Sequence, residues 1–119
     1  MAENALLQRT KTYALRIIRL YVALPKTTEA QVLGKQVLRS GTSIGAHYRE
    51  ANRAKSDADF ISKIETALQE LDETIYWLEL IVEAKIFNEQ KGVSLIEETK
   101  ELNAIFTTIV KKIKDRKRK

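Results

Sequence analysis

The chain offers few side chains that could carry out catalysis. His47 is its single histidine, there is no cysteine, and no Gly-x-Ser-x-Gly motif is present, so the paired nucleophile and base of acyl transfer are missing. A di-iron centre in a helical bundle needs a Glu-x-x-His motif on each of two helices. Here Glu50 follows His47, and no glutamate precedes the histidine at that spacing. We therefore expect no enzymatic activity, no metal site and no cofactor.

The segment 40–45, Ser-Gly-Thr-Ser-Ile-Gly, has the composition of a phosphate-binding loop. Such a loop follows a strand and ends in Lys followed by Ser or Thr, and this segment has neither feature. Gly41 and Gly45 are about one helical turn apart, so we expect Ser40, Gly41 and Gly45 to let a neighbouring helix approach closely. The alternatives are a kink at this point and a nest of backbone amides that binds an anion.

Charged residues are unevenly distributed along the chain, although the net charge is only +5. Residues 1–55 carry ten Lys or Arg and three Asp or Glu, residues 56–110 carry four and twelve, and residues 111–119 carry seven and one. The chain is therefore a basic half, an acidic half and a basic tail. Such asymmetry indicates charged partners.

The basic tail predicts contacts with the phosphates of RNA or DNA, which Lys and Arg neutralise without reading the base sequence. The residues concerned are Lys111, Lys112, Lys114, Arg116, Lys117, Arg118 and Lys119. The alternative is that this segment only increases solubility.

Four basic residues share one stripe of the second predicted helix, because at 100° per residue they fall within about 80° of one another. They are Lys35, Arg39, Arg49 and Arg53. A matching acidic line with heptad spacing on the third predicted helix consists of Glu65, Asp72 and Glu79. We expect the two stripes to meet, either within one subunit or between subunits packed head to tail, which can close a ring. The alternatives for the basic stripe are support for phosphate contacts by Arg39, Arg49 and Arg53, and a solvated helix face.

Five aromatic residues could stack on nucleic-acid bases. They are Tyr13, Tyr21, Tyr48, Tyr76 and Trp77. Tyr13 lies on an apolar seam, and the pair Tyr76-Trp77 lies in the most hydrophobic predicted helix. We expect these side chains to be buried in the core or in an interface rather than to bind bases.

Helices must position these residues, because apolar side chains recur at spacings of three and four over four segments. The first segment begins near Leu6 and ends at Pro25, whose ring cannot continue the helical hydrogen bonds. The second is expected over about residues 29–54, with Thr28 as its N-cap and Gln31 completing a capping box.

The third and fourth helices are expected to follow the N-caps Ser56 and Asn88. The predicted core of the third is Phe60, Ile64, Leu68, Leu71, Ile75, Leu78 and Val82. Because short connections force neighbouring helices to be antiparallel, the predicted fold is all-α, an antiparallel up-down-up-down four-helix bundle. The bundle is expected to span residues 1–114, and the apolar pattern ends from Lys111 onward, so the tail 115–119 is expected to fray into solvent.

A length of 119 residues with 44% apolar residues suits a single hydrophobic core. The first residues lack the charged start and apolar run of a secretory signal, and no stretch approaches the roughly 20 apolar residues that cross a bilayer. The lack of cysteine suits a reducing compartment. We therefore expect a soluble, cytoplasmic protein with no membrane partner.

Three motifs of the chain resemble the hallmark of one bacterial protein family. They are residues 36–46 (Gln-Val-Leu-Arg-Ser-Gly-Thr-Ser-Ile-Gly-Ala) followed by Glu50-Ala51, then Ser56-x-x-Asp59-Phe60-Ile61-x-Lys63, then Glu70 with Glu73-Thr74-x-Tyr76-Trp77-Leu78. The chain is similar in this respect to the four-helix bundle or 23S rRNA-intervening-sequence proteins, also called S23 ribosomal proteins. The resemblance covers essentially the whole chain. His47 is a departure, because the family pattern commonly has Asn there.

The resemblance implies an up-down four-helix bundle that typically assembles as a pentameric ring. Family members are encoded inside insertions in large-subunit rRNA genes. A similar basic pentamer is the accessory protein of a reverse transcriptase in retroelements, which implies that nucleic-acid binding is within the reach of this fold.

The residues and the resemblance together predict a non-enzymatic homo-oligomer, most simply a pentamer, that binds RNA or DNA largely through phosphate contacts. The alternative is an oligomeric scaffold that binds a partner protein and no nucleic acid. No small-molecule substrate is expected.

Overall fold

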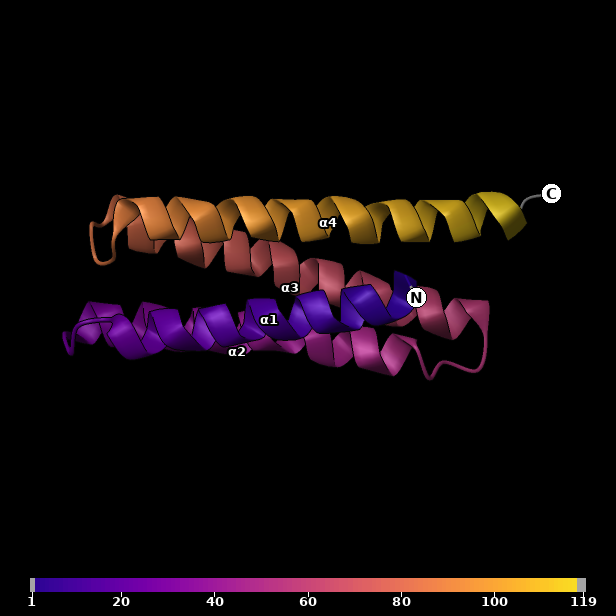
Figure 1. The fold of residues 1–119 in the computed structure, drawn as a ribbon, viewed down its shortest axis with the longest axis horizontal. Helices are drawn as coiled ribbons and strands as arrows, with labels where there is room; N and C mark the ends of the chain where they lie inside the picture. Colours follow the sequence, from indigo (N-terminus) through magenta and orange to yellow (C-terminus); the bar gives the residue numbers. More distant parts are fainter. Residues whose placement is uncertain (1, 118–119) are drawn as a thin grey trace.

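The computed structural model of the chain describes residues 2–117, with side chains from residue 5 onward, and this part is built from four helices. They are α1 (Ala2–Ala23), α2 (Thr28–Ala51), α3 (Asp57–Glu83) and α4 (Glu89–Lys117). Consecutive helices run antiparallel along a bundle 52 Å long (Figure 1). The predicted all-α antiparallel four-helix bundle is therefore confirmed.

The four sides of the bundle are not equally tight. The backbones of α1 and α2, of α2 and α3, and of α3 and α4 approach closely along their lengths, whereas α1 and α4 remain farther apart. Side chains span this wider side, for example in the contact between the hydroxyls of Tyr13 and Thr99, 2.6 Å apart. The side between α1 and α4 is consequently the one where the molecule is most open.

Short side chains cap the helices, and one cap differs from the prediction. Thr27, and not Thr28, is the N-cap of α2, because the Thr27 hydroxyl accepts a hydrogen bond from the amide of Ala30. Gln31 does not complete a capping box. Its side-chain nitrogen Nε2 donates instead to the backbone carbonyl of Pro25. From the sequence alone, either Thr27 or Thr28 could be the N-cap. The structure has Thr27 as the N-cap, with Ala30 buried in the core three residues later.

The other two predicted caps are present. The hydroxyl of Ser56 accepts from the amide of Asp59 at the start of α3, and the side-chain oxygen of Asn88 accepts from the amide of Lys91 at the start of α4. At the end of α3, Lys85 adopts a left-handed conformation with φ of 58°, which lets the chain turn towards α4.

Two helix ends differ from the expected positions. α2 ends at Ala51 rather than near residue 54, and the Asn52 side chain donates to the carbonyl of Tyr48 at this end. α4 continues to Lys117, so the part of the tail that the structure describes is helical rather than frayed.

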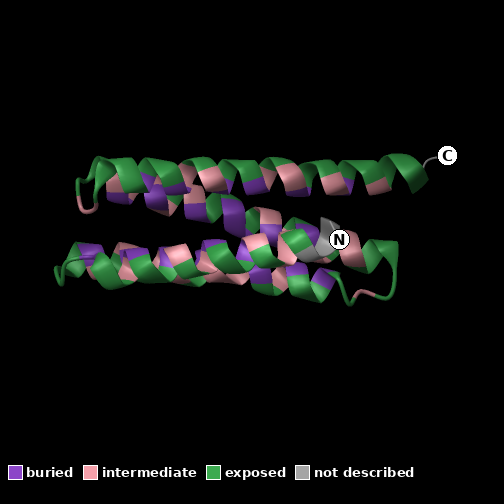
Figure 2. Cartoon of the chain, viewed as in Figure 1, coloured by how far each residue is buried: buried purple, intermediate pink, exposed green. Residues whose placement is uncertain are grey.

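The core lies between the helices, and its pattern on α3 is only partly the predicted one (Figure 2). Of the predicted core residues, Ile64, Leu71 and Leu78 are buried. Only half-buried are Phe60, Leu68, Ile75 and Val82. The other buried positions of α3 are Ala67, Glu70, Thr74 and Ile81. Phe60 and Leu68 nevertheless pack against the core. The pattern differs from the predicted one because α3 packs on two helices, and small or polar residues complete the side that faces α2.

None of the described helices is sufficiently long and apolar to cross a membrane.

Candidate nucleic-acid interface

The last two turns of α4 carry a dense group of basic side chains. In the described part of the chain these are Lys111, Lys112, Lys114, Arg116 and Lys117, all of them exposed. At 100° per residue they point in all directions around the helix instead of forming one stripe. This helix end extends beyond the N-terminal end of α1 (Figure 1). Arg118 and Lys119 lie outside the described residues.

Two of these side chains hold the end of α4 against α3. Lys114 Nζ lies 3.2 Å from Glu65 Oε2, and Arg116 Nη2 lies 3.4 Å from Asp57 Oδ2. Ion pairs as exposed as these contribute about 0.2–1 kcal/mol each. The other three cations, Lys111, Lys112 and Lys117, form no ion pair with any described residue. Their charges are therefore available to an anionic partner.

Basic residues from α2 and the following connection lie at the same end of the bundle. Arg49 is exposed in the last turn of α2, and Arg53 and Lys55 are exposed in the connection to α3. Lys55 and Ile113 of α4 line one cleft, which places this connection beside the end of α4. We call the following residues the basic end: Arg49, Arg53, Lys55, Lys111, Lys112 and Lys117.

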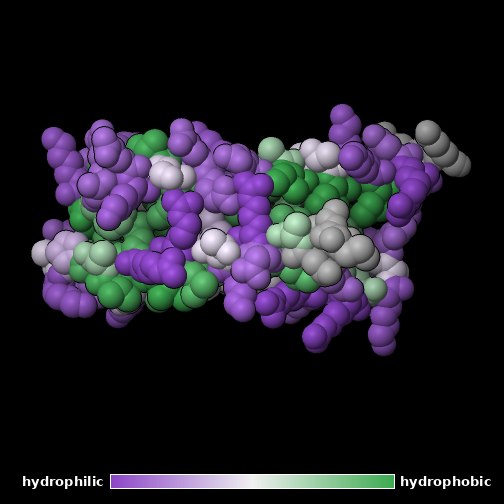
Figure 3. Space-filling model, viewed as in Figure 1, coloured by the Kyte–Doolittle hydropathy of each residue, from purple (hydrophilic) through white to green (hydrophobic). Residues whose placement is uncertain are grey.

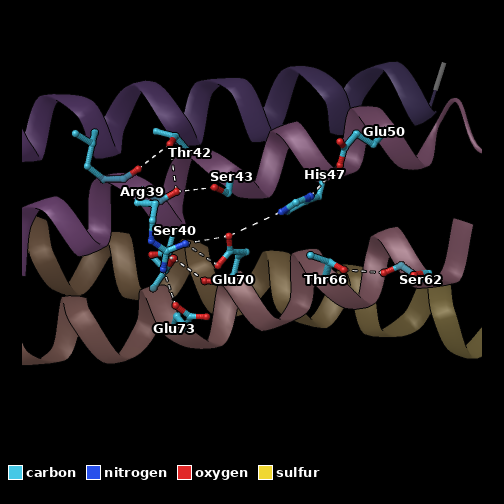
Figure 4. Close-up of polar contacts among 12 residues, drawn as sticks. Arg39, Ser40, Thr42, Ser43, His47, Glu50, Ser62, Thr66, Glu70 and Glu73 are labelled. Atoms are coloured by element: carbon cyan, nitrogen blue, oxygen red, sulfur yellow. Dashed lines mark hydrogen bonds and ion pairs between the residues drawn. The ribbon is translucent and has the colours of Figure 1, made fainter. Parts of the chain in front are cut away.

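Arg39 is already engaged by α3 of its own chain (Figure 4). Its Nη2 lies 2.7 Å from Glu73 Oε1, and its Nη1 lies 3.4 Å from Glu70 Oε2. The hydrogen bond to Glu73 is the main reason that the pKa of Arg39 is raised. With two carboxylate partners, Arg39 is a poorer candidate for a phosphate contact than Arg49 or Arg53.

His47 belongs to the same polar network between α2 and α3. Its Nε2 lies 3.8 Å from the buried carboxylate of Glu70, and its Nδ1 lies 2.9 Å from Oε1 of Glu50 (Figure 4). The hydrogen bond from His47 lowers the pKa of Glu50. In the part of the chain that the structure describes, no three histidine or acidic residues gather in a way that could hold a metal ion.

The Ser40–Gly45 segment is an uninterrupted part of α2. Its backbone amides are used inside the helix, so they do not form an anion-binding nest. A Cβ atom at Gly41 would lie 2.9 Å from Cγ1 of Ile17 on α1, and one at Gly45 would lie 3.2 Å from Oγ1 of Thr10. On its other side the segment meets α3, where the hydroxyls of Ser40 and Thr74 are 2.8 Å apart. The small residues of this segment thus face α1 on one side and α3 on the other.

The acidic line of α3 is directed towards α4 and solvent. Glu65 pairs with Lys114, and Asp72 Oδ1 accepts a hydrogen bond of 3.1 Å from Asn103 Nδ2. Glu79 is partly exposed and has no ion pair among the described residues. Within one chain, this line therefore does not meet the basic stripe of α2.

The aromatic residues differ in their exposure. Tyr13 and Tyr48 are buried, and Tyr48 stacks on Phe106 with ring centroids 5.4 Å apart. Trp77 is half-buried against Tyr76, with ring centroids 5.2 Å apart. Tyr76 itself is 54% exposed, so it is the aromatic side chain best placed to contact another molecule.

One basic site was missed by the sequence reasoning. A groove with a volume of about 460 Å³ lies between α1 and α4. We call it the basic groove: Arg16, Arg19 and Lys91 surround a floor of Leu20, Ala23, Phe87 and Leu95. Arg16 Nη2 donates to the hydroxyl of Ser94 across the groove, at 3.1 Å.

A charged clamp closes the same side of the bundle beyond the groove. Arg9 donates from Nε to Glu98 Oε2 and from Nη2 to Glu98 Oε1, both at 2.8 Å, and its Nη2 also reaches Glu101 at 2.8 Å. The hydrogen bond from Arg9 lowers the pKa of Glu98. The sequence holds no local signal for these contacts, because the partners are about 90 residues apart and become neighbours only through the topology.

The model of the 23S rRNA-intervening sequence protein family matches residues 2–108. The chain belongs to this family. A solved structure of a protein of unknown function from the S23 ribosomal protein family of Bacteroides thetaiotaomicron is 40% identical, covers 93% of this chain and 99% of that chain, and superposes with a TM-score of 0.86. The resemblance inferred from the three motifs is thereby confirmed. A search of curated proteins gives no match.

The part shared with the 23S rRNA-intervening sequence family ends just before the basic tail. The matched segment stops at residue 108, whereas the cluster of cations begins at Lys111. Arg49 and Arg53 lie inside the matched segment. Membership of the family therefore accounts for the bundle, whereas the cations from Lys111 onward lie beyond the matched segment.

Proposed function

We propose that this chain forms a closed homo-oligomer, most simply a pentameric ring, that binds RNA or DNA through phosphate contacts at the basic end. Its role is binding rather than catalysis. The observation that carries the proposal is that Lys111, Lys112 and Lys117 are exposed on an ordered helix and have no carboxylate partner among the described residues. A cation in this state releases the counterions of a phosphate without first breaking an ion pair of its own.

The arrangement favours binding without base recognition. The cations surround the end of α4, and the exposed aromatic Tyr76 lies in α3, towards the opposite end of the bundle (Figure 1). Phosphate contacts position a protein on nucleic acid and carry no sequence information. We therefore expect similar affinities for unrelated sequences of the same length.

Assembly into a ring should raise the affinity for nucleic acid above that of a single basic end. A ring whose axis is parallel to the bundles presents every basic end on one face. Once one subunit is bound, the others meet the same strand at a high effective concentration, which raises the affinity without any new type of contact.

Fluorescence anisotropy with a labelled generic RNA and a labelled DNA duplex tests the proposal. The variant carries Lys111→Glu, Lys112→Glu and Lys117→Glu, and it leaves intact the ion pairs of Lys114 and Arg116. We expect its affinity for both probes to fall by about tenfold or more, because the phosphate contacts become repulsive.

The matched control carries Lys26→Glu, Lys85→Glu and Lys100→Glu, which make the same change in net charge away from the basic end. The control should bind nearly as tightly as the parent. Equal binding by the tail variant and the parent would overturn the proposal. A parent protein that assembles but binds neither probe at low salt would instead act as a protein-binding scaffold.

A further inference from the structure

Further apolar side chains are exposed on α1, on the side of the helix adjacent to the one that lines the basic groove. Beside it, α1 exposes Leu15, Ile18 and Val22, the last of which is 70% exposed. Figure 3 shows hydrophobic side chains gathered on this face, at the end of the bundle where α1 connects to α2. Exposed apolar side chains interspersed with charges are typical of a site where another macromolecule docks.

The groove also carries unpaired positive charge. Among the described residues, Arg19 and Lys91 are exposed and have no ion pair, and Arg16 donates a hydrogen bond to the neutral hydroxyl of Ser94 but forms no ion pair. The surface that fits this site must therefore combine apolar and acidic groups.

The outward side of α3 has that combination. We call it the acidic face: Asp72, Tyr76, Glu79 and Glu83. Spacings of four, three and four place these residues along one side of the helix. Tyr76 is 54% exposed, and neither Glu79 nor Glu83 has an ion pair among the described residues.

The acidic face and the basic groove lie at the same height along the bundle. Gly41 of α2 packs against Ile17 of α1, while its neighbour Ser40 contacts Thr74 of α3. Ile17 and Thr74 are thus level, and α1 and α3 run in the same direction. The groove residues after Ile17, namely Arg19, Leu20 and Ala23, are consequently level with Tyr76, Glu79 and Glu83, the residues of the acidic face after Thr74.

The two surfaces cannot satisfy each other within one chain. The groove opens between α1 and α4, whereas the acidic face is the solvent side of α3, which packs on α2 and α4. Complementary patches at one height on different sides of a molecule are what a head-to-tail ring with its axis along the bundles requires.

We propose that the basic groove of one copy receives the acidic face of α3 of the next copy. Tyr76 is the anchor that enters the apolar floor, as buried tyrosines do at the centre of many interfaces. Glu79 and Glu83 pair with the cations of the rim and set the register, a role in which charges contribute specificity. The inference rests on the assembly part of the proposed function and assigns its interface to α1, α3 and α4, instead of the basic stripe of α2.

Charge reversal with light scattering tests this interface. One variant carries Arg16→Glu and Arg19→Glu, and a second carries Glu79→Arg and Glu83→Arg. We expect each to dissociate to the 13.6 kDa chain at micromolar concentration while circular dichroism shows that it remains helical. A third variant with all four changes restores the complementarity and should regain the mass of the parent. Tyr76→Ala should raise the dissociation constant by about 30-fold, as loss of an interface anchor does.

The control Arg49→Glu with Arg53→Glu changes as much charge at the C-terminal end of α2 and in the connection that follows it. It should keep the parent mass and lose only nucleic-acid affinity. Dissociation of this control, with an intact assembly of the groove variant, would place the interface on α2 and overturn the inference. The inference would also be overturned if the variant with all four charge reversals remained dissociated, or if the parent protein were monomeric. These results concern mass alone, so they are separate from the binding test of the basic end.

Discussion

The hydroxyl of Tyr13 donates a hydrogen bond of 2.6 Å to the hydroxyl of Thr99, joining α1 to α4 inside the bundle. The direction follows from a second bond, in which the Thr99 hydroxyl donates to the carbonyl of Leu95 at 2.6 Å. Both side chains are buried, and burial raises the pKa of Tyr13. The pair thus links the two helices whose backbones approach least closely.

Replacing Thr99 should cost more than replacing Tyr13. Thr99→Val leaves the Tyr13 hydroxyl buried without an acceptor, which costs about 1–3 kcal/mol. Tyr13→Phe removes the donor while Thr99 keeps its bond to Leu95, so the cost is about 1 kcal/mol. Urea denaturation at fixed protein concentration measures both values. A smaller loss for Thr99→Val than for Tyr13→Phe would show that the contact is not formed in solution.

The clamp between Arg9 and Glu98 predicts a loss of stability in acid. Because the folded-state pKa of Glu98 is lowered, its contribution is complete above its ordinary pKa of 4.5 and is lost as the pH falls through the lower folded value. Arg9 stays charged throughout, since its pKa is raised. Thermal midpoints from about pH 7 to about pH 3 should fall more steeply for the parent than for Glu98→Gln. Parallel curves would contradict this account of the clamp.

Close packing of α1 on α2 predicts that Gly45 does not accept a large side chain. Gly45→Leu places atoms where Thr10 lies and should lower the free energy of unfolding by about 1–3 kcal/mol. Ala46→Leu is the matched control, because Ala46 is exposed in the same turn. A stable Gly45→Leu variant would mean that the two helices are not in close contact here.

The fold could be read from the sequence because large apolar residues at spacings of three and four mark each helix, and Pro25 marks a boundary. The same signal fails where small or polar residues are buried. Thr74 and Glu70 are buried on α3 because they form hydrogen bonds with Ser40 and Arg39 of α2. Those partners are more than 30 residues away in the sequence, so no local pattern predicts the contacts.

The candidate site was predictable in part for a similar reason. The cations of the tail are contiguous in the sequence, so their exposure could be predicted from composition, whereas their place on a continuous helix could not, because the apolar pattern ends before them. The basic groove combines Arg16 with Lys91. These residues become neighbours only because α4 returns beside α1. The pattern within each helix does not show which residues of α1 and α4 lie close together.

The turn after α3 predicts a stabilising substitution. Lys85 holds a left-handed conformation that disfavours side chains with a Cβ atom. Lys85→Gly should raise the free energy of unfolding by about 0.5–1 kcal/mol, after allowance for the greater freedom of glycine in the unfolded chain. Guanidinium denaturation checks the sign. A loss of stability would show that this turn is not left-handed in solution.

The salt dependence of nucleic-acid affinity tests the central claim most directly. Each phosphate neutralised by the basic end contributes about −0.7 to the log–log slope for a single strand and about −0.9 for a duplex. Engagement of three lysines of one subunit thus predicts a slope of about −2 or steeper for single-stranded RNA. We expect the variant with Lys111, Lys112 and Lys117 reversed to bind the probe too weakly to show such a slope. An affinity that stays constant from about 50 to about 200 mM salt would contradict phosphate binding.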